Sequence, residues 1–370
     1  MQFCTHCLYN SFKPDISFDV HGVCSACQAF YARDKIDWDG RALQFMRLVS
    51  NTKLDAADAG LAYDCIVPVS GGKDSHYQVI TALEYGLRVL AVTAVTDHLS
   101  PIGRRNLDNI AKLGCDHIEV KTDPVIRRKI NRFTLETVGD ISWAEHITIF
   151  SIPIRIASMM KIPLLVWGEN PQHEYGGPAV AQKATELTQD WLNEFGGLNG
   201  LRIDDVETAL GPIGDLYRYP DLDNFVPKGV FLGQFFPWDG LANARMAAAR
   251  GFEYSVEPVE MSGFRYENLD NVQTGIHDRL KYLKFGFGRA TDICCNLIRR
   301  GVMSREQAIE HVRKWDGNFP LTYLGVGIGE VLNSIGMSGD EYLAVEEMFA
   351  NRDLFDIGSD GLAVPKFEVK

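Results

Sequence analysis

The chain lacks any apolar run approaching the roughly 20 residues that a helix needs to cross a bilayer. Its first residues, from Met1 to Cys7, have neither the basic start nor the apolar core of a signal peptide. We therefore expect a cytoplasmic protein that does not insert into membranes.

Positive charge is also in short supply. The 370 residues carry 37 lysines and arginines against 49 aspartates and glutamates, a formal net charge of −12 at pH 7. Proteins that bind nucleic acids usually present a basic face, so this balance argues against a nucleic acid as the main ligand. One stretch departs from the acidic balance of the whole chain, because 265–314 holds ten basic and six acidic residues. It is either a solvated helix surface or a site for a phosphorylated or carboxylated substrate.

Both sequence signatures of a glutaminase are missing. No Gly-x-Cys-x-Gly nucleophile elbow occurs, and position 2 is not a cysteine that could act as an N-terminal nucleophile. If the chemistry of this chain uses ammonia, we expect the ammonia to come from a partner glutaminase or from free ammonium.

Cysteine is uncommon, with eight residues, yet four of them are grouped near the N-terminus in the pattern C-x2-C-x16-C-x2-C. This spacing predicts a four-thiolate zinc knuckle made by Cys4, Cys7, Cys24 and Cys27. Two disulfides are disfavoured without a secretion signal, and a redox CxxC would leave one pair unexplained. Because four protein ligands leave no open coordination position, we expect the zinc to be structural and not catalytic.

A glycine loop follows the apolar run 65–69 and precedes a helix-like segment, His76 to Tyr85. A strand, a glycine turn and a helix start make an anion site, because free backbone N–H groups point at the ligand. The loop is not a Walker A motif, since Val67 stands where that motif needs its first glycine. Its sequence instead resembles the SGGxDS pyrophosphate loop (PP-loop) of the ATP pyrophosphatase superfamily. The residues are Ser70, Gly71, Gly72, Lys73, Asp74 and Ser75.

Strand and helix patterns alternate after this loop, with further predicted strands at 87–95, 117–121 and 163–167. This alternation predicts an α/β fold with a doubly wound parallel sheet of the PP-loop ATP pyrophosphatase type. Ligands of such sheets lie at the carboxyl ends of strands, so we expect the glycine loop, Thr93–Asp97 and Gly168-Glu169-Asn170 to form one nucleotide crevice. The segment 230–236 is a further strand candidate, followed by a turn at 237–240, and the last hundred residues are predicted to be mostly helical.

A second polar segment, 275–292, contains His277, Lys281 and Lys284 at helical spacing, so the three share one helix face. Gly286-Phe287-Gly288 then interrupts the helix and can bring Arg289 against a ligand. A solvated basic helix face is the alternative interpretation of this pattern.

Together these motifs resemble the N-acetyl sugar amidotransferases of surface-polysaccharide (lipopolysaccharide, O-antigen) and nonulosonic-acid biosynthesis. The resemblance runs over about residues 1 to 350 and rests on the knuckle with 18–27, the glycine loop, Trp167-Gly168-Glu169-Asn170, and 277–292. It implies an enzyme that converts a sugar acetamido group to an acetamidino group with ATP and ammonia, releasing AMP and pyrophosphate. It also implies partners: a separate glutaminase and a cyclase-like subunit, which resemble the two halves of imidazole glycerol phosphate synthase.

The expected domains are a zinc knuckle at 1–30, a helical connector at 31–60, an ATP-binding α/β domain at 61–240, and a mostly helical region at 241–370 that contributes to the substrate site. Lys73 and Asp74 are the expected catalytic residues, with Asp74 as a Mg²⁺ ligand. The ATP-binding set is expected to be Ser70, Gly71, Gly72, Lys73, Asp74, Ser75, Thr93, Gly168 and Glu169. The sugar or nucleotide-sugar substrate is expected to meet Asn170, His277, Lys281, Lys284 and Arg289.

Other functions stay open at this point. A tRNA-modifying sulfur transferase of the same superfamily would want a catalytic cysteine near the ATP site and a basic RNA face. The adjacent pair Cys294 and Cys295 does not indicate one, since neighbours on a helix point in different directions. A regulatory module that binds nucleotide without turnover and an amide-forming synthetase acting on a free carboxylate are further alternatives.

Overall fold

The structure, a computed structural model, describes residues 1–170, 174–178, 191, 194, 196–220, 225, 227–359 and 361–369. A five-stranded sheet has the order β3-β2-β1-β4-β5, and all neighbouring strands pair in parallel. The order steps outward from β1 in both directions, which confirms the predicted doubly wound sheet. The strands are β1 (Cys65–Pro68), β2 (Val89–Ala94), β3 (Asp116–Val120), β4 (Leu164–Trp167) and β5 (Lys228–Phe231).

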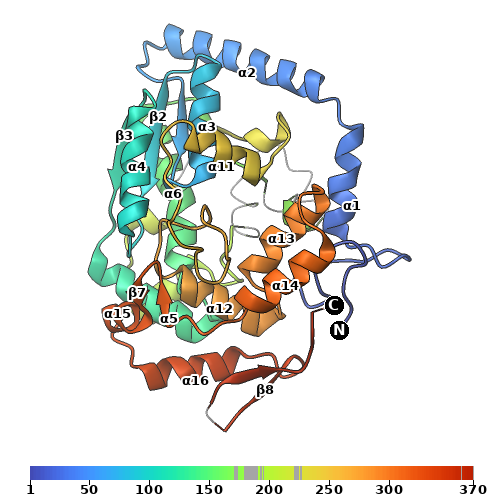
Figure 1. Cartoon of the computed structure of the whole chain (residues 1–370). Helices are drawn as coiled ribbons and strands as arrows, with labels where there is room; N and C mark the ends of the chain where they lie inside the picture. The colour runs from blue at the N-terminus through green and yellow to red at the C-terminus, as the bar shows by residue number, and fades with distance from the viewer. Residues whose placement is uncertain are drawn as a thin grey trace.

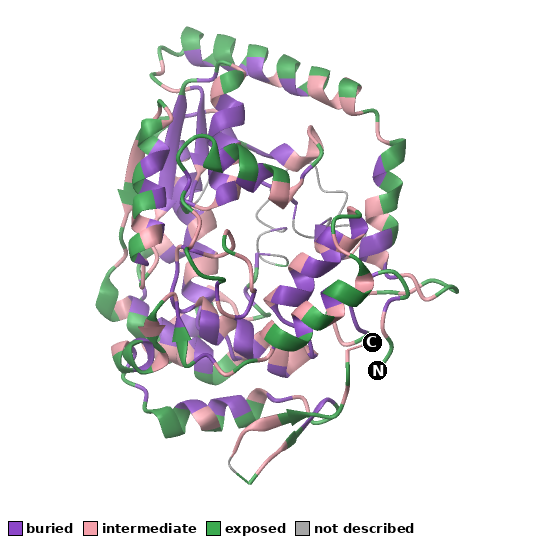
Figure 2. Ribbon diagram, viewed as in Figure 1, coloured by how far each residue is buried: buried purple, intermediate pink, exposed green. Residues whose placement is uncertain are grey.

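The central strands are apolar on both faces because helices cover both faces of the sheet. In β1, Ile66 lies opposite Leu90 and Leu165 and packs with the α6 side of the core. Its neighbours Cys65 and Val67 belong to the core on the opposite face. Figure 2 shows these strands buried in the middle of the fold.

On one face of the sheet lie α2 (Trp38–Asp58), α3 (Lys73–Glu84) and α4 (Pro101–Lys112), which contribute Phe45, Val79 and Ile110 to the core. α11 (Gly240–Ala248) packs along α3. The other face is covered by α6 (Trp143–Met160), which α5 (Pro124–Val138) precedes. α2 crosses one end of the molecule, with most of its outer face exposed (Figures 1 and 2).

The C-terminal region is mostly helical, as predicted, and two short hairpins interrupt it. Capping boxes begin two of its helices, since Ser304 and Ser338 accept from the N–H groups of Gln307 and Glu341. The remaining elements are α1 (Ser25–Ala32), α10 (Ile203–Leu210), α12 (Thr274–Phe285), α13 (Arg289–Arg299), α14 (Arg305–Trp315), α15 (Ile328–Ser334), α16 (Gly339–Phe349), β6 (Thr322–Tyr323), β7 (Val326–Gly327), β8 (Phe355–Ile357) and β9 (Ala363–Pro365).

One predicted strand is shorter than expected. The segment 230–236 does not continue as a strand, because β5 ends at Phe231 and a 3-10 turn, Leu232–Gln234, follows. Gly233 N donates to the carbonyl of Gly168, and Trp238 packs close to Gly233, so the chain turns back toward α3. The predicted turn before a helix is confirmed: Asp239 accepts from Leu241 N at 2.9 Å and α11 begins at Gly240.

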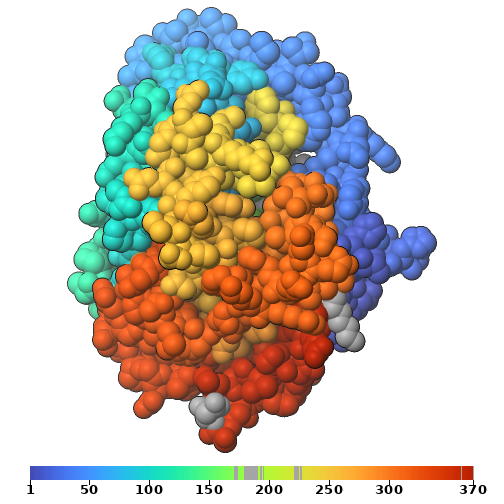
Figure 3. All heavy atoms as spheres, in the orientation of Figure 1, coloured from blue at the N-terminus to red at the C-terminus, as the bar shows by residue number. Residues whose placement is uncertain are grey.

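Three remote parts of the chain meet beside the sheet. The N-terminal cysteine segment packs against α13 and α14 in one apolar cluster that includes Tyr9, Phe287 and Val312. The segment from α11 to α12 lies over the front of the molecule, between the α3–α4 side and α13 (Figure 3). Among the described residues, no helix combines the length and the apolar character needed to traverse a bilayer.

Candidate active site

The glycine loop connects β1 to the start of α3, at the carboxyl edge of the sheet, as predicted. Gly71 has φ +87°, and a Cβ there would lie 2.9 Å from the backbone nitrogen of Leu107. Both observations require glycine at this position. Ser70 N donates to Ser75 Oγ at 3.0 Å, which closes the loop around the first turn of α3. The N–H groups at the start of α3 are thereby placed as an anion site.

Lys73 lies buried between two carboxylates. Its Nζ is 2.8 Å from Asp74 Oδ2 and 2.9 Å from Glu267 Oε1. Burial alone would lower the pKa of Lys73, but Asp74 and Glu267 hold it well above its usual value. The ammonium is therefore charged at neutral pH. Asn243 Nδ2 donates to Asp74 Oδ1 at 2.8 Å and orients this carboxylate from α11.

A cavity of about 330 Å³ opens beside the loop, and we call it the nucleotide cavity. Its lining combines the ends of β1, β2 and β4 with apolar side chains of α6. The expected Thr93, Gly168 and Glu169 all line it. The Thr93 hydroxyl donates to the carbonyl of Val69 and lies 2.8 Å from His117 Nε2, so this side chain is already bonded within the sheet.

Carboxylates crowd the wall of the nucleotide cavity. Burial and then repulsion from Asp270 raise the pKa of Glu145 to about 7. Burial and then repulsion from Asp74 raise the pKa of Glu169 to about 8. Mg²⁺ prefers oxygen ligands and would relieve this repulsion, so the residues present fit a magnesium ion that accompanies a nucleotide. Asp74, the expected ligand, belongs to this group.

The second cavity, of about 450 Å³, lies between α12, α13 and the N-terminal segment. It brings together His277, Lys281, Lys284 and Arg289, which were expected to meet the substrate. Lys13 also lines it, and sequence reasoning missed this residue. An anionic substrate would meet cations from three separate segments there.

Each predicted cation of the second cavity also has a protein partner. Lys281 forms an ion pair with Asp292, and Lys284 Nζ donates to the carbonyls of Val138 and Gly139 at the end of α5. Arg289 lies against the carboxylate of Asp278, at 3.1 and 2.9 Å. These contacts fix where the cations lie within the cavity wall.

Asn170 is the exception among the predicted substrate residues. It is buried, its carbonyl accepts from Glu174 N, and it is not among the residues that line the cavities described here.

A narrow cavity of about 60 Å³, which we call the connecting cavity, lies between the two sites and shares lining residues with each. It shares Asp74 and Glu169 with the nucleotide cavity. It shares Tyr175, Arg289 and Asp292 with the second cavity. Lys73 and Glu267 line it as well, so the buried lysine faces the route between the two larger cavities.

The four N-terminal cysteines meet as one buried cluster, with their sulfur atoms within 4.8 Å of one another. Sγ of Cys4 lies 4.0 Å from that of Cys27, and Sγ of Cys7 lies 3.6 Å from that of Cys24. A tetrahedral zinc ion with Zn–S bonds of about 2.3 Å would place sulfur atoms about 3.8 Å apart. The four thiols therefore fit zinc.

The cysteine cluster packs against α13, and this helix carries residues that line both the connecting cavity and the second cavity. Leu8 N lies 3.3 Å from the Sγ of Cys295, and the Tyr9 hydroxyl donates to Asp292 Oδ1 at 2.9 Å. Arg299 lies over the Tyr9 ring. The knuckle thus reaches the second cavity through α13.

Residues 259–363 match the family described as LPS biosynthesis protein WbpG-like, C-terminal domain. This match covers less than a third of the chain and includes α12 and α13. No curated protein matches the chain. Among solved structures, NMN synthetase from Francisella tularensis is similar at 13% identity with a TM-score of 0.29, over 60% of this chain and 99% of that chain.

Several site residues were not predicted from the sequence, namely Lys13, Asp140, Glu145, His146, Asn243, Glu267 and Asp270. Glu267 and Asp270 lie in the segment before α12, where no periodic pattern marks a function. The sequence pattern predicts a helix that begins at Ile147, two residues after Glu145, whereas α6 begins at Trp143 and includes Glu145 in its first turn. An earlier helix start would have drawn attention to Glu145 and His146 as first-turn residues.

Proposed function

We propose that this chain is an ATP-dependent amidotransferase that converts the acetamido group of a sugar or nucleotide sugar into an acetamidino group. The observation that carries the proposal is the connecting cavity, which Lys73 lines and which shares lining residues with both the glycine-loop cavity and the cation-lined second cavity. The match of 259–363 to a domain of LPS biosynthesis proteins supports a sugar as the occupant of the second cavity.

In the first step, the amide oxygen of the substrate attacks the α phosphorus of ATP, and pyrophosphate leaves. The N–H groups of the glycine loop and the Ser70 and Ser75 hydroxyls would hold the β and γ phosphates. Lys73 would stabilise the negative charge that develops on them, because a preorganised cation in a buried site acts strongly. A bound Mg²⁺ would supply further charge neutralisation at the phosphates, held by Asp74 and neighbouring carboxylates.

In the second step, ammonia replaces the activated oxygen and AMP leaves with it. The substrate is held by Arg289 and by the neighbouring cations of the second cavity. Since the chain lacks both glutaminase signatures, the ammonia would come from a separate glutaminase that works with a cyclase-like subunit. The cysteine cluster would hold a structural zinc ion that keeps α13 in place.

A sulfur transferase is the competing function, and it needs a reactive thiol beside the nucleotide. No cysteine occurs among the described residues that line the three cavities. Burial raises the pKa of Cys115 to about 11 and that of Cys294 to about 12, so neither is a ready nucleophile. The cavity linings therefore favour amidine formation over sulfur transfer.

The purified chain would be incubated with ATP, Mg²⁺, ammonium and a panel of N-acetylated nucleotide sugars and sialic-acid-like sugars, with products measured by mass spectrometry. We expect AMP, pyrophosphate and a sugar in which one oxygen is replaced by NH. If the acetyl oxygen carries a heavy isotope, that isotope should appear in AMP. AMP formation that depends on tRNA or on a free carboxylic acid, with no sugar product, would refute the proposal.

A further inference from the structure

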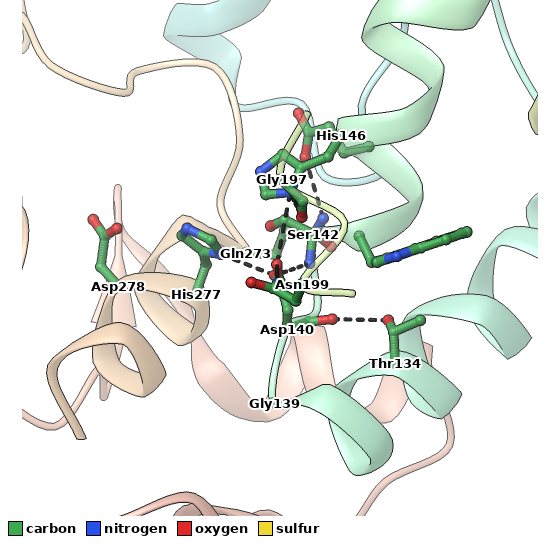
Figure 4. A network of polar contacts seen from close by, with 12 residues as sticks. Thr134, Gly139, Asp140, Ser142, His146, Gly197, Asn199, Gln273, His277 and Asp278 are labelled. Atoms are coloured by element: carbon green, nitrogen blue, oxygen red, sulfur yellow. Dashed lines mark hydrogen bonds and ion pairs between the residues drawn. The ribbon is translucent and has the colours of Figure 1, made fainter. Parts of the chain in front are cut away.

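Asp140 lies in the turn between α5 and α6, and two histidines from different helices converge on it (Figure 4). Asp140 Oδ1 lies 2.9 Å from Nδ1 of His277 on α12. Asp140 Oδ2 lies 3.6 Å from Nδ1 of His146 on α6. Burial alone would raise the pKa of Asp140, but His277, followed by His146 and Ser142, holds it below its usual range. The buried carboxylate therefore stays ionised.

The backbone fixes the direction of this carboxylate. Ser142 N donates to Asp140 Oδ1 at 2.8 Å, and Asn199 Nδ2 donates to Asp140 Oδ2 at 2.9 Å. The preceding Gly139 has φ +61°, and a Cβ there would lie 2.8 Å from the Cε of Lys284. The turn is thus held from both sides, and Asp140 presents its oxygens to the histidines in one orientation.

An ionised carboxylate only accepts hydrogen bonds, so His277 carries a proton on Nδ1 in this arrangement. In the neutral ring the lone pair is then on Nε2. Within the described part of the chain, no hydrogen bond to His277 Nε2 occurs. His277 lines the second cavity and keeps 24% of its side chain exposed. The lone pair is available to a molecule in that cavity.

This pair lies close to the nucleotide cavity as well. Glu145 and His146 are consecutive residues of α6, and they line the nucleotide cavity and the second cavity respectively. Gln273, one turn before His277, donates to Glu145 Oε2 at 3.3 Å. The helices α6 and α12, which carry His146 and His277, therefore lie between the two cavities.

We infer that His277 is the general base of the ammonia step and that Asp140 is its positioning residue. This inference rests on the proposed function. Ammonia forms a new C–N bond to the activated imidate carbon, and the adduct nitrogen then carries an extra proton. His277 Nε2 accepts that proton, and the C–O bond to AMP breaks with its electron pair on the departing oxygen. The amidine remains, and AMP holds the former amide oxygen.

A divalent metal is the other occupant that an Asp-His-His cluster can attract, since the three ligand atoms lie within 4.8 Å. The observed contacts favour the base. Both carboxylate oxygens already accept from Ser142 and Asn199, and His146 Nδ1 lies 3.2 Å from the carbonyl of Gly197. A metal ion would have to displace these contacts, whereas in the general-base arrangement they remain and keep Asp140 oriented toward His277.

The test separates the two half-reactions with the sugar that the parent chain converts. The first half is followed as sugar-dependent exchange of labelled pyrophosphate into ATP, and the second as amidine formed at saturating ammonium. In His277→Gln we expect exchange within about threefold of the parent and amidine formation lower by about 10²–10⁴-fold, the usual contribution of a general base. His21→Asn, an exposed histidine far from the pair in sequence, is the matched control and should change neither rate.

The outcomes distinguish this inference from the proposed function. If the parent chain exchanges pyrophosphate with no sugar, the proposed function fails and the base assignment fails with it. If the parent converts a sugar and His277→Gln reduces both half-reactions equally, only the base assignment fails. The same holds if His277→Gln reduces neither half-reaction. Loss of one metal equivalent in His277→Gln, with the cysteine-bound zinc retained, would replace the base with a metal site.

Asp140→Asn tests positioning without using the sugar. The amide can donate to Nδ1 and so favours the opposite ring tautomer, with the proton on Nε2. Long-range proton–nitrogen NMR of histidine-labelled protein should show the Nδ1–H form of His277 in the parent and its loss in Asp140→Asn. An Nε2–H tautomer in the parent chain would overturn the assignment.

Discussion

The nucleotide cavity and the second cavity are built in different ways. The first lies where parallel strands end, and contiguous motifs such as the glycine loop supply its anion-binding atoms. The second takes Lys13, Asp140 and His277 from segments more than a hundred residues apart. The sheet therefore dictates one site by its topology, while the other depends on how remote segments pack.

The two cavities also differ in charge. Four carboxylates are among the described residues that line the nucleotide cavity, and burial raises the pKa of Glu145 and of Glu169. The second cavity instead collects Lys13, Lys281 and Arg289. Under the proposed function ATP, an anion, would bind beside this acidic wall together with a cation, whereas the second cavity would accept an anionic group directly. Each prediction below changes one side of this comparison.

The largest effect should follow from Lys73→Ala. Lys73 belongs to the glycine loop and lines the connecting cavity, so its loss should reduce kcat/KM for amidine formation by about 10³-fold. The exposed Lys112→Ala on α4 is the matched control and should leave kcat/KM unchanged. Urea denaturation of both variants checks folding, because the substitution leaves Asp74 and Glu267 without their common cation. Near-parental kcat/KM in a folded Lys73→Ala would remove the lysine from the reaction.

The next effect should follow from Cys24→Ser, which removes one thiol of the cluster. We expect the zinc content to fall from one equivalent toward zero and amidine formation to fall by at least about tenfold, because the cluster supports α13. ATP affinity, measured by calorimetry, should change far less, since none of the described residues that line the nucleotide cavity comes from the knuckle. Cys115→Ser, outside the cluster, is the control. An equal loss of ATP affinity would show that the knuckle supports the whole chain and not one cavity.

The sequence predicted the parts of the molecule that are local in the chain. The glycine loop needs glycine at position 71 because φ is positive there and the backbone of Leu107 lies close by. A requirement of this kind fixes the residue type at one position, so it can be recognised in the sequence. The four cysteines likewise show their spacing directly. The strand predicted over 230–236 was too long, because the contact of Gly233 with Gly168 is remote in sequence.

Side-chain partners could not be predicted in the same way. Helical spacing correctly placed Lys281 and Lys284 on one face, and both line the second cavity. It could not show that Asp292 pairs with Lys281, or that Lys284 donates to the end of α5. The Asp140–His277 pair joins the turn after α5 to α12, and its two residues are 137 positions apart in the chain. Periodicity predicts which residues share one face of a helix, while the groups that contact those residues depend on tertiary packing.

A smaller effect is expected for Lys13→Ala, which removes a cation of the second cavity that lies over the Tyr9 ring. The KM for an anionic sugar should rise by about fivefold, equivalent to ~1 kcal/mol, as is typical of a partly exposed charge. The KM for ATP should stay the same. The exposed Lys35→Ala is the control. A rise in KM for ATP alone would mean that the two cavities are not divided as described.

The smallest effect concerns stability and tests the acidic wall itself. The pKa of Glu145 is raised from 4.5 to about 7, so between these values the unfolded chain ionises this carboxyl while the folded chain keeps it protonated. Stability is therefore lost as pH rises from about 4.5 to about 7 and is constant above that range. The isosteric Glu145→Gln should remove this loss. The full shift corresponds to about 3 kcal/mol, and partial exposure reduces the expected gain to about 1–2 kcal/mol at pH 8.

The measurement compares urea unfolding of the parent and Glu145→Gln at pH 5 and pH 8, without nucleotide. The difference in unfolding free energy between the two chains should be larger at pH 8, because only there does the parent carry the buried charge. Glu136→Gln, a more exposed glutamate on α5, should show no such pH dependence. A stabilisation that is the same at both pH values would mean that Glu145 ionises normally. The acidic wall would then be solvated, and the nucleotide cavity would lack the charge repulsion that argues for a bound cation.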